Sequence, residues 1–294
     1  MLLDELRTLL ARHARTDWTT GLDGVLVSRV DRTDPPTPSM SGTVLAVIAQ
    51  GAKRLALGDR VYEYHAGQYL VASVDLPVTG NFVGATPDRP ALGFGLALEP
   101  PAIADLLLQT APGTAPRSTG ASTGLAVSDA SDELLDAVVR LLRLLDRPRD
   151  IDVLAPLYKK EILWRLITGP QGPMIRQIGL ADSNLAHIAR AVRWIRENYA
   201  TSFRVEDVAQ FVGMSPSAFY RNFQAVTAMS PIRFQKQIRL QEARLLLAAR
   251  PKDVASVGHS VGYDSPSQFS REYRRLFGAP PSQDVTRLHG AAVP

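Results

Sequence analysis

Two segments in the last third of the chain repeat one another: VEDVAQFVGMSPSAFYRNF (205–223) and VASVGHSVGYDSPSQFSREYRRLF (254–277). Both place valine at the first, fourth and eighth positions, with glycine directly after the last valine. Further along, Pro216 matches Pro266 and Arg221 matches Arg271, but the second segment holds one extra residue before its proline. The chain therefore contains an internal repeat with a one-residue insertion.

This repeat has the pattern of a helix-turn-helix. Valines at that spacing line one face of a short helix, and the following glycine permits a sharp reversal of the chain. A proline in the first turn of the next helix costs no hydrogen bond, and Ser215, Asp264 or Ser265 would cap that helix. We therefore predict two helix-turn-helix units, over 205–225 and 254–277. The alternative, an ordinary helical bundle, would have to produce the same turn twice by chance.

Large aromatic residues also recur in both units at helical spacing. Such residues are far more often core than base-stacking groups, so we assign them to the core. The residues are Phe219, Phe223, Phe269, Tyr273 and Phe277.

Charge is distributed unevenly along the chain. Residues 1–183 carry 18 Lys and Arg against 21 Asp and Glu, whereas residues 184–294 carry 15 against 8, so the net charges are −3 and +7. A basic segment joined to a mildly acidic one indicates a module that binds a polyanion beside one with another task. Chance variation of the surface is the alternative explanation.

The N-terminal part has the pattern of a small antiparallel β domain. Gly58-Asp59 predicts a tight hairpin, and the segment 65–68 predicts the next reversal. Helical periodicity follows in 132–146 and 153–168, and the Pro-, Gly- and Ser-rich segment 112–131 is expected to be a loop. We predict a barrel or sandwich over residues 20–100 from short β-branched runs at 24–30, 43–49, 53–57, 60–64, 69–74 and 92–98.

Bulk composition narrows the class of protein. The chain has 294 residues, 45% of them hydrophobic, which fits two globular domains. It lacks cysteine, so disulfides and thiolate metal sites are excluded. No segment reads as a membrane span, and the charged start MLLDELRTLL does not read as a signal peptide, so we expect a cytoplasmic protein.

Residues 185–288 resemble the DNA-binding domain of the AraC/XylS family of transcription regulators. Besides the repeats, SPIRFQKQIRLQEARLLL (230–247) is similar to the family's long linking helix, and YRRLFGAPP (273–281) is similar to its closing signature. The stretch VYEYHAGQYLVASVDLPVTG (61–80) resembles the subgroup with a cupin-like regulatory domain. Gly258 stands where the family usually has alanine, which would loosen that helix slightly, and His65 replaces a residue that is often small.

The resemblance implies a multidomain chain. We expect a mainly-β cupin-like barrel with flanking helices over residues 1–180 and an all-α DNA-binding domain with two helix-turn-helix motifs over residues 181–294. The second helices of both motifs would enter successive major-groove segments of double-stranded DNA, about 34 Å apart. Because the two motifs differ, each is expected to read its own half of an asymmetric site.

The resemblance also assigns the DNA contacts. Arg221 and Arg271 are the strongest candidates, because a guanidinium can bond guanine O6 and N7 together, and Gln268 suits adenine. An ion pair with Glu272 is the alternative for Arg271. The full set of base-reading candidates is Ser217, Ala218, Tyr220, Arg221, Ser265, Ser267, Gln268 and Arg271. Phosphate contacts, each with a plain solvated charge as its alternative, are expected from Arg204, Lys236, Arg239, Arg274 and Arg275.

Three hypotheses compete for the N-terminal domain: a sensor of a small-molecule effector, a metal-dependent enzyme, and a unit that serves only dimerisation. A cupin iron site needs two histidines and a carboxylate, but the strand region, residues 20–100, holds only His65, which we expect at the surface. We therefore expect no catalytic residues, metal or cofactor. The sequence does not say which strand residues face the interior, so no effector-binding residue is predicted.

Together these observations predict a DNA-binding transcription regulator, an activator that responds to an effector and acts as a homodimer, with RNA polymerase as a further partner. The alternatives are a repressor and a ligand-independent regulator. A nuclease is disfavoured because the basic part of the chain holds no clustered carboxylates for a metal.

Overall fold

The computed structural model describes residues 1–109, 123–249 and 254–290, and the side chains up to Thr286. The chain divides into two compact units. The N-terminal unit comprises Met1–Ala189 with Ala225–Ala228, and the C-terminal unit comprises Arg190–Gln224 with Met229–Pro294.

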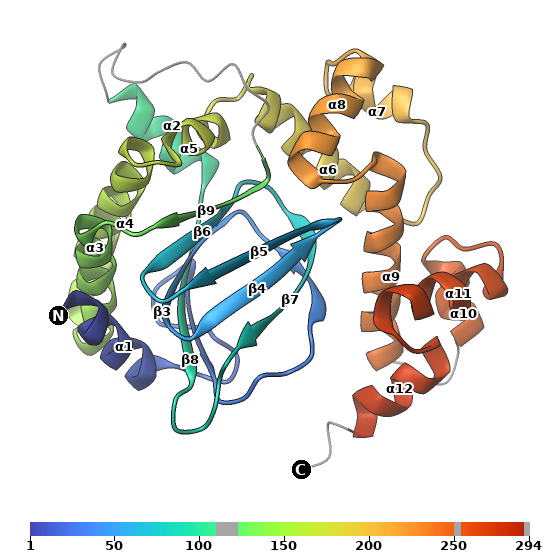
Figure 1. Cartoon of the computed structure of the whole chain (residues 1–294). Helices are drawn as coiled ribbons and strands as arrows, with labels where there is room; N and C mark the ends of the chain where they lie inside the picture. The colour runs from blue at the N-terminus through green and yellow to red at the C-terminus, as the bar shows by residue number, and fades with distance from the viewer. Residues whose placement is uncertain (110–122, 250–253, 291–294) are drawn as a thin grey trace. The chain divides into compact units, whose positions relative to one another are not determined.

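The N-terminal unit is built on two antiparallel sheets (Figure 1). The five-stranded sheet has the order β1-β8-β3-β6-β9, with β1 at Val25–Val30, β8 at Ala91–Ala97, β3 at Val44–Gln50, β6 at Gln68–Ala72 and β9 at Leu125–Asp129. The four-stranded sheet has the order β2-β7-β4-β5, with β2 at Thr37–Ser41, β7 at Leu76–Val83, β4 at Ala52–Leu57 and β5 at Arg60–His65. The predicted mainly-β class is confirmed.

Alternation along the strands places apolar side chains inside the N-terminal unit. Val25 and Val27 of β1 are buried whereas Leu26 between them is exposed, as expected for a strand with one covered face. Gly58, at φ +60°, forms the predicted two-residue turn between β4 and β5. His65 is exposed at the end of β5, as predicted.

Three strands were not predicted. Strands β2 and β7 contain Pro38, Pro77 and Gly80, residues that usually argue against a strand. The prediction of a loop over 112–131 was wrong at its end, because Leu125–Asp129 pairs with β6. Pairing with β6 outweighs the local turn-rich composition, and residues 110–122 lie outside the described part of the chain.

Helices flank the sheets of this unit (Figure 1). Helix α1 (Leu2–His13) contacts β1, β3 and β8, and α3 (Asp132–Arg143) packs between α1 and α4 (Ile151–Thr168). The predicted helices at 132–146 and 153–168 are therefore confirmed, the first ending in a short 3₁₀ turn at Leu144–Asp146. Two shorter helices, α2 (Pro100–Leu108) and α5 (Gly172–Gly179), were not predicted.

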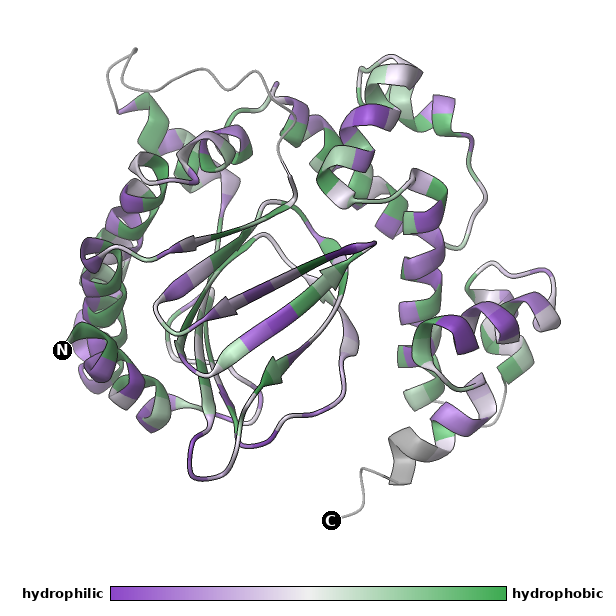
Figure 2. Ribbon diagram, in the orientation of Figure 1, coloured by the Kyte–Doolittle hydropathy of each residue, from purple (hydrophilic) through white to green (hydrophobic). Residues whose placement is uncertain are grey.

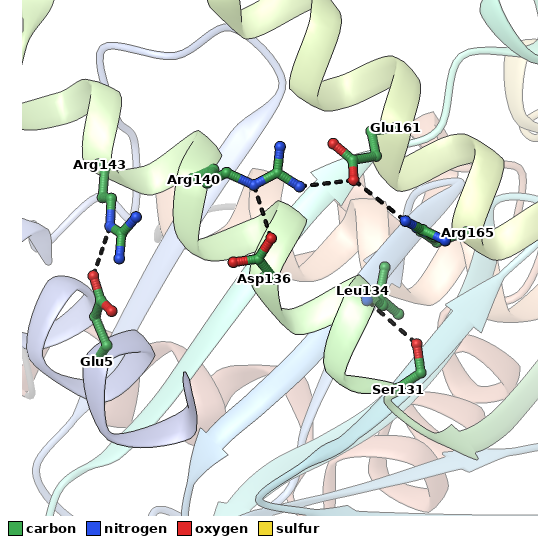
Figure 3. Close-up of polar contacts among 8 residues, drawn as sticks. All are labelled: Glu5, Ser131, Leu134, Asp136, Arg140, Arg143, Glu161 and Arg165. Atoms are coloured by element: carbon green, nitrogen blue, oxygen red, sulfur yellow. Dashed lines mark hydrogen bonds and ion pairs between the residues drawn. The ribbon is translucent and has the colours of Figure 1, made fainter. Parts of the chain in front are cut away.

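Ion pairs tie these helices together (Figure 3). The Arg143 Nε of α3 lies 2.7 Å from Glu5 Oε1 of α1, and Arg140 bridges Asp136 at 2.9 Å to Glu161 of α4 at 2.7 Å. Ser131 caps α3 by accepting a hydrogen bond from the Leu134 amide. The carboxylates lower the ordinary cost of placing Arg140 at a partly buried helix contact.

The C-terminal unit is all-helical. Its helices are α6 (Asn184–Glu197, which begins in the N-terminal unit), α7 (Val205–Phe211), α8 (Pro216–Thr227, whose last three residues belong to the N-terminal unit), α9 (Pro231–Ala249), α10 (Val254–Ser260), α11 (Pro266–Phe277) and α12 (Pro281–Gly290). Helices α7 and α8 form the first helix-turn-helix, and α10 and α11 form the second, with α9 between them. Figure 2 shows hydrophilic residues along much of the length of α11.

Candidate nucleic-acid interface

The first helix-turn-helix has the predicted construction. Val208 and Val212 are buried, and Gly213 turns the chain at φ +74°. Ser215 accepts a hydrogen bond from the Ala218 amide at 3.4 Å, and Phe219 is fully buried between the helices. These contacts fix the start of α8 and leave its opposite side to solvent.

The second unit repeats this construction with a longer turn. Four residues, 212–215, separate α7 from α8, but five, 261–265, separate α10 from α11. Gly262 takes φ +90°, and Ser265 caps α11 by accepting a hydrogen bond from the Gln268 amide. Gly278, at φ +78°, ends the helix. The insertion inferred from the repeat is therefore a turn residue.

The aromatic residues assigned to the core are packed inside the two units. Phe219, Phe223, Phe269 and Tyr273 are buried, whereas Phe277 is partly exposed. Neighbouring rings contact one another in tilted or T-shaped pairs, which join Phe219, Phe223 and Phe234 in the first unit and Tyr263, Phe269, Tyr273 and Phe277 in the second. Phe234 of α9 is a buried core residue that the repeat pattern did not reveal, and the partly buried Trp194 of α6 packs on Phe203.

Gly258 accommodates one of these rings. A Cβ at this position would lie 2.8 Å from Cδ1 of Phe269. The glycine thus lets the buried ring approach the backbone of α10. Close packing on Phe269 counters the loosening that the sequence suggested.

Two arginines stand at equivalent positions, five residues after the proline that begins each second helix. Arg221 of α8 and Arg271 of α11 are exposed, and neither has a hydrogen-bond or ion-pair partner within the part of the chain that the structure describes. The expected alternative partner of Arg271, Glu272, is engaged elsewhere. Both guanidinium groups are therefore available to an external acceptor.

The remaining base-reading candidates differ in their surroundings. Ser217, Tyr220 and Ser267 are exposed, whereas Ala218, Ser265 and Gln268 are partly buried. Ser265 Oγ lies 2.9 Å from Ser267 Oγ, and Gln268 Nε2 donates to Glu272 Oε1 at 3.1 Å. In α11, residues 267, 268, 271, 274 and 275 follow the helical repeat, so they share one face.

Glu272 is the centre of a polar cluster behind that face. It accepts hydrogen bonds from Lys236 Nζ of α9 at 2.9 Å, Gln268 Nε2 and the Tyr263 hydroxyl at 2.9 Å. Burial alone would raise the pKa of Glu272, but these hydrogen bonds outweigh burial and lower it. The carboxylate thus holds Gln268 in one orientation before any ligand arrives.

The candidates for phosphate contacts fall into two groups. Arg204, Arg274 and Arg275 are exposed, and Arg204 makes only a long 3.8 Å contact with Glu206. Lys236 is paired with Glu272, and Arg239 is held by backbone carbonyls. The first group is free to move toward a polyanion, whereas the second group already stabilises the fold.

Arg239 joins the two helix-turn-helix units. From α9 it donates Nε to the Tyr199 carbonyl at 2.7 Å, Nη2 to the Ala200 carbonyl at 3.2 Å and Nη1 to the Gly262 carbonyl at 2.7 Å. The first two acceptors precede α7 and the third lies in the turn before α11. These three hydrogen bonds leave two of the five guanidinium N–H groups of Arg239 unused. The sequence predicted a phosphate contact for Arg239 and did not predict this structural role.

The N-terminal unit holds a second candidate site, an open cavity of about 830 Å³ between its sheets. Its wall is mostly apolar and includes Lys53, Leu55, Tyr64 and Phe82 of the four-stranded sheet. No group of three or more His, Asp or Glu residues within the described ranges lies close enough together to hold a metal ion. Likewise, no described helix has the length and apolarity needed to cross a bilayer.

Two family models match the chain. The model of the AraC-type transcriptional regulator N-terminus covers residues 21–174, more than half of the chain, and a helix-turn-helix domain model covers residues 208–287. The chain belongs to the AraC-type transcriptional regulators. The resemblance inferred from the repeat and from residues 61–80 is therefore confirmed.

Relatives of this regulator include the HTH-type transcriptional regulator ExsA of Pseudomonas aeruginosa, 27% identical over 157 residues, which cover 53% of this chain and 56% of ExsA. The arabinose operon regulatory protein of Escherichia coli is 33% identical over 97 residues, which cover 33% of each chain. The alignments thus span about half or less of these relatives' lengths.

Solved structures share the fold of this regulator over nearly its whole length. The structure of unsaturated fatty acid bound wild-type ToxT from Vibrio cholerae has a TM-score of 0.55 at 11% identity, covering 90% of this chain and 95% of that one. At this identity the likeness concerns the fold alone. It confirms the combination of a cupin-like β unit with a helical unit.

Proposed function

We propose that this regulator binds promoter DNA in a sequence-specific manner through both helix-turn-helix units. The observation that carries the proposal is a pair of equivalent, exposed arginines, Arg221 and Arg271, each near the start of a capped second helix and without a partner among the described residues. A guanidinium in that position can bond guanine in the major groove. The net charge of +7 over residues 184–294 favours approach to DNA.

The proposed contacts divide into base-reading contacts and phosphate contacts. Base edges are read by Ser217, Ala218, Tyr220 and Arg221 of the first unit and by Ser265, Ser267, Gln268 and Arg271 of the second. Phosphates are bound by Arg204, Arg274 and Arg275, with Lys236 and the unused N–H groups of Arg239 as further donors. Because α11 continues its polar face with Arg274 and Arg275 whereas α8 continues with Gln224 and Ala225, we propose that the second unit contributes more phosphate contacts.

The test of this function compares two arginines of the same helix. The binding sequence is first selected from a random DNA library with the full-length protein. Arg271→Ala should then lose about 1–3 kcal/mol of binding to that sequence and discriminate less against a scrambled one. Arg274→Ala should weaken binding to both sequences alike and reduce its salt dependence. Undiminished discrimination by Arg271→Ala would remove Arg271 from the base-reading set.

We further propose that the protein is a homodimer joined through α4. This helix presents an exposed apolar stripe of Val153, Leu157 and Trp164, whose relative exposures are 69%, 57% and 37%. A helix face of this kind can pair with its own copy across a two-fold axis. Leu157→Asp should shift the protein to monomer in sedimentation velocity, with Asp152→Asn, an exposed residue of α4 outside the stripe, as the control. An unchanged sedimentation coefficient for Leu157→Asp would contradict this interface.

The remaining proposals concern regulation. We propose that the N-terminal cavity binds a small-molecule effector, supported by its volume and by the fatty acid bound in ToxT. The protein would act in the cytoplasm as an activator that contacts RNA polymerase, without catalytic activity of its own. A dimerisation unit without a ligand is the competing function, and its stability would not respond to any effector.

A further inference from the structure

Three large side chains form a row across the inner face of the four-stranded sheet. Lys53 of β4 stands opposite Phe82 of β7 on one side and opposite Tyr64 of β5 on the other. All three line the cavity between the sheets, whereas the next residue, Arg54, points outward and pairs with Glu63 at 2.7 Å. The row therefore places a cation on the side of the strand that is normally apolar.

Among the residues that the structure describes, Lys53 has no counter-ion. It is the only cationic residue among the described residues that line the cavity, and its Nζ lies 5.0 Å from the centre of the Phe82 ring. The acidic lining residues, Asp23 and Asp34, are both exposed, and Asp34 pairs with Arg32 at 3.0 Å. No carboxylate lies within ion-pair distance of Lys53 in the described part of the chain.

The surroundings of Lys53 penalise its charge. Part of the Lys53 side chain borders the cavity and is partly exposed, but protein atoms enclose the ammonium, and this burial lowers its pKa. A buried cation without a partner destabilises the fold, and the Phe82 ring offsets only part of that cost. A buried ammonium retained despite this cost in stability indicates that a bound ligand supplies its anionic partner.

Tyr64 supplies a second, independent sign of a missing ligand. Its side chain is fully buried, and its hydroxyl has no hydrogen-bond partner in the structure. Buried hydroxyls are normally paired. Directly opposite side chains on neighbouring strands stand about 5 Å apart at Cβ, so Lys53 and Tyr64 can both reach one small anionic group.

The other residues that line the cavity indicate the character of the rest of the ligand, to which the anionic group is attached. The cavity surface is mostly apolar, and its volume of about 830 Å³ falls in the range of sites for small organic molecules. The apolar lining residues include Leu22, Val25, Val47, Leu55, Val78 and Phe94. A ligand that is polar on all sides would leave much of this wall without a matching surface.

We propose that the cavity binds an organic carboxylate with an apolar body, whose carboxylate accepts hydrogen bonds from the Lys53 ammonium and the Tyr64 hydroxyl. The proposal rests on the effector-binding role proposed above and gives it a chemical class. It does not depend on the DNA contacts, because every residue involved belongs to the N-terminal unit.

The test uses full-length protein and three probes in isothermal titration calorimetry: decanoate, 1-decanol and arabinose. Decanoate should bind more tightly than the alcohol of equal chain length, and arabinose should not bind. Lys53→Met, which keeps an apolar stem, should weaken decanoate about tenfold or more without affecting decanol, and Tyr64→Phe should weaken decanoate by a smaller factor. Arg54→Met, on the outer face of the same strand, is the matched control and should bind decanoate as the wild type does.

Each other outcome overturns the proposal. Equal binding of decanoate and decanol would mean that no anion site exists, and binding of arabinose alone would indicate a polyol site. Decanoate binding that survives Lys53→Met would move the anion site elsewhere. Binding to the selected DNA is measured on the same samples without probes, so failure of the ligand class is distinguished from failure of the DNA-binding function.

Discussion

Substituting Gly262 by alanine should disrupt the connection between the two helix-turn-helix units. Gly262 adopts φ +90°, a conformation that costs an L-residue about 1–2 kcal/mol. A Cβ there would also overlap the Ala200 carbonyl oxygen and lie 2.8 Å from Arg239 Cζ. Relieving that overlap moves the turn away from Ala200 and lengthens the hydrogen bonds that Arg239 donates to the Ala200 and Gly262 carbonyls. Overpacking of this kind costs about 1–3 kcal/mol more, for a total of about 2–5 kcal/mol.

Gly278 provides the matched control for the backbone term. It has φ +78° in the same unit, but a Cβ there would meet no atom within 4 Å. Gly278→Ala should therefore cost only about 1–2 kcal/mol. The difference between the two variants isolates the contact between the second turn and the segment before the first unit.

Hydrogen exchange of the full-length protein, followed by mass spectrometry, is the suitable assay because it reports local opening. Gly262→Ala should accelerate exchange in α9, α10 and the segment around Ala200 together, and it should weaken binding to the selected DNA. Gly278→Ala should affect mainly the end of α11. If Gly262→Ala accelerated hydrogen exchange no more than Gly278→Ala does, the Arg239 hydrogen bonds would not be what holds the two helix-turn-helix units together.

Two further predictions concern buried polar groups. Asp284 is almost fully buried and accepts hydrogen bonds from Arg244 and Tyr273, so Asp284→Ala should destabilise the C-terminal unit by about 3 kcal/mol in urea titrations, whereas Tyr273→Phe should cost about 1.5 kcal/mol. Burial lowers the pKa of Lys53 in the folded chain, so the unfolded chain binds its proton more tightly. Stability of the N-terminal unit should therefore rise as pH increases from the folded pKa toward the ordinary lysine pKa. Lys53→Met should abolish this rise and increase the melting temperature at neutral pH, and a lower melting temperature would contradict the penalty.

The sequence predicted the C-terminal unit more fully than the N-terminal one because its signals are local. Valine spacing, a turn glycine and a capping serine all act within one helix-turn-helix, so Gly213, Gly262 and Ser265 have the expected roles. The missed strand β9 depends on pairing with β6, a partner more than fifty residues away in the chain. No local propensity encodes such a pairing.

The candidate sites also divide into residues with local signals and residues whose partners lie far away in the sequence. Exposed Arg221 and Arg271 could be named because their positions follow from the repeat. The roles of Glu272, which orients Gln268, and of Arg239 could not be predicted, since their partners lie on other helices or in distant turns. Likewise, the inward direction of Lys53 depends on which face of β4 the second sheet covers.

Lys53 is a charged residue on the inward, mostly apolar face of β4, and this mismatch is informative about function. Two neighbouring positive charges, Lys53 and Arg54, follow one another on a strand, so alternation must turn one of them inward. Arg54 finds Glu63, but the inward residue finds only an aromatic face and an unpaired hydroxyl neighbour. An apolar residue there would pack better against Leu55 and Phe82. Stability alone would favour that replacement. The retained lysine is therefore explained by a function, which is to bind the carboxylate of the proposed ligand.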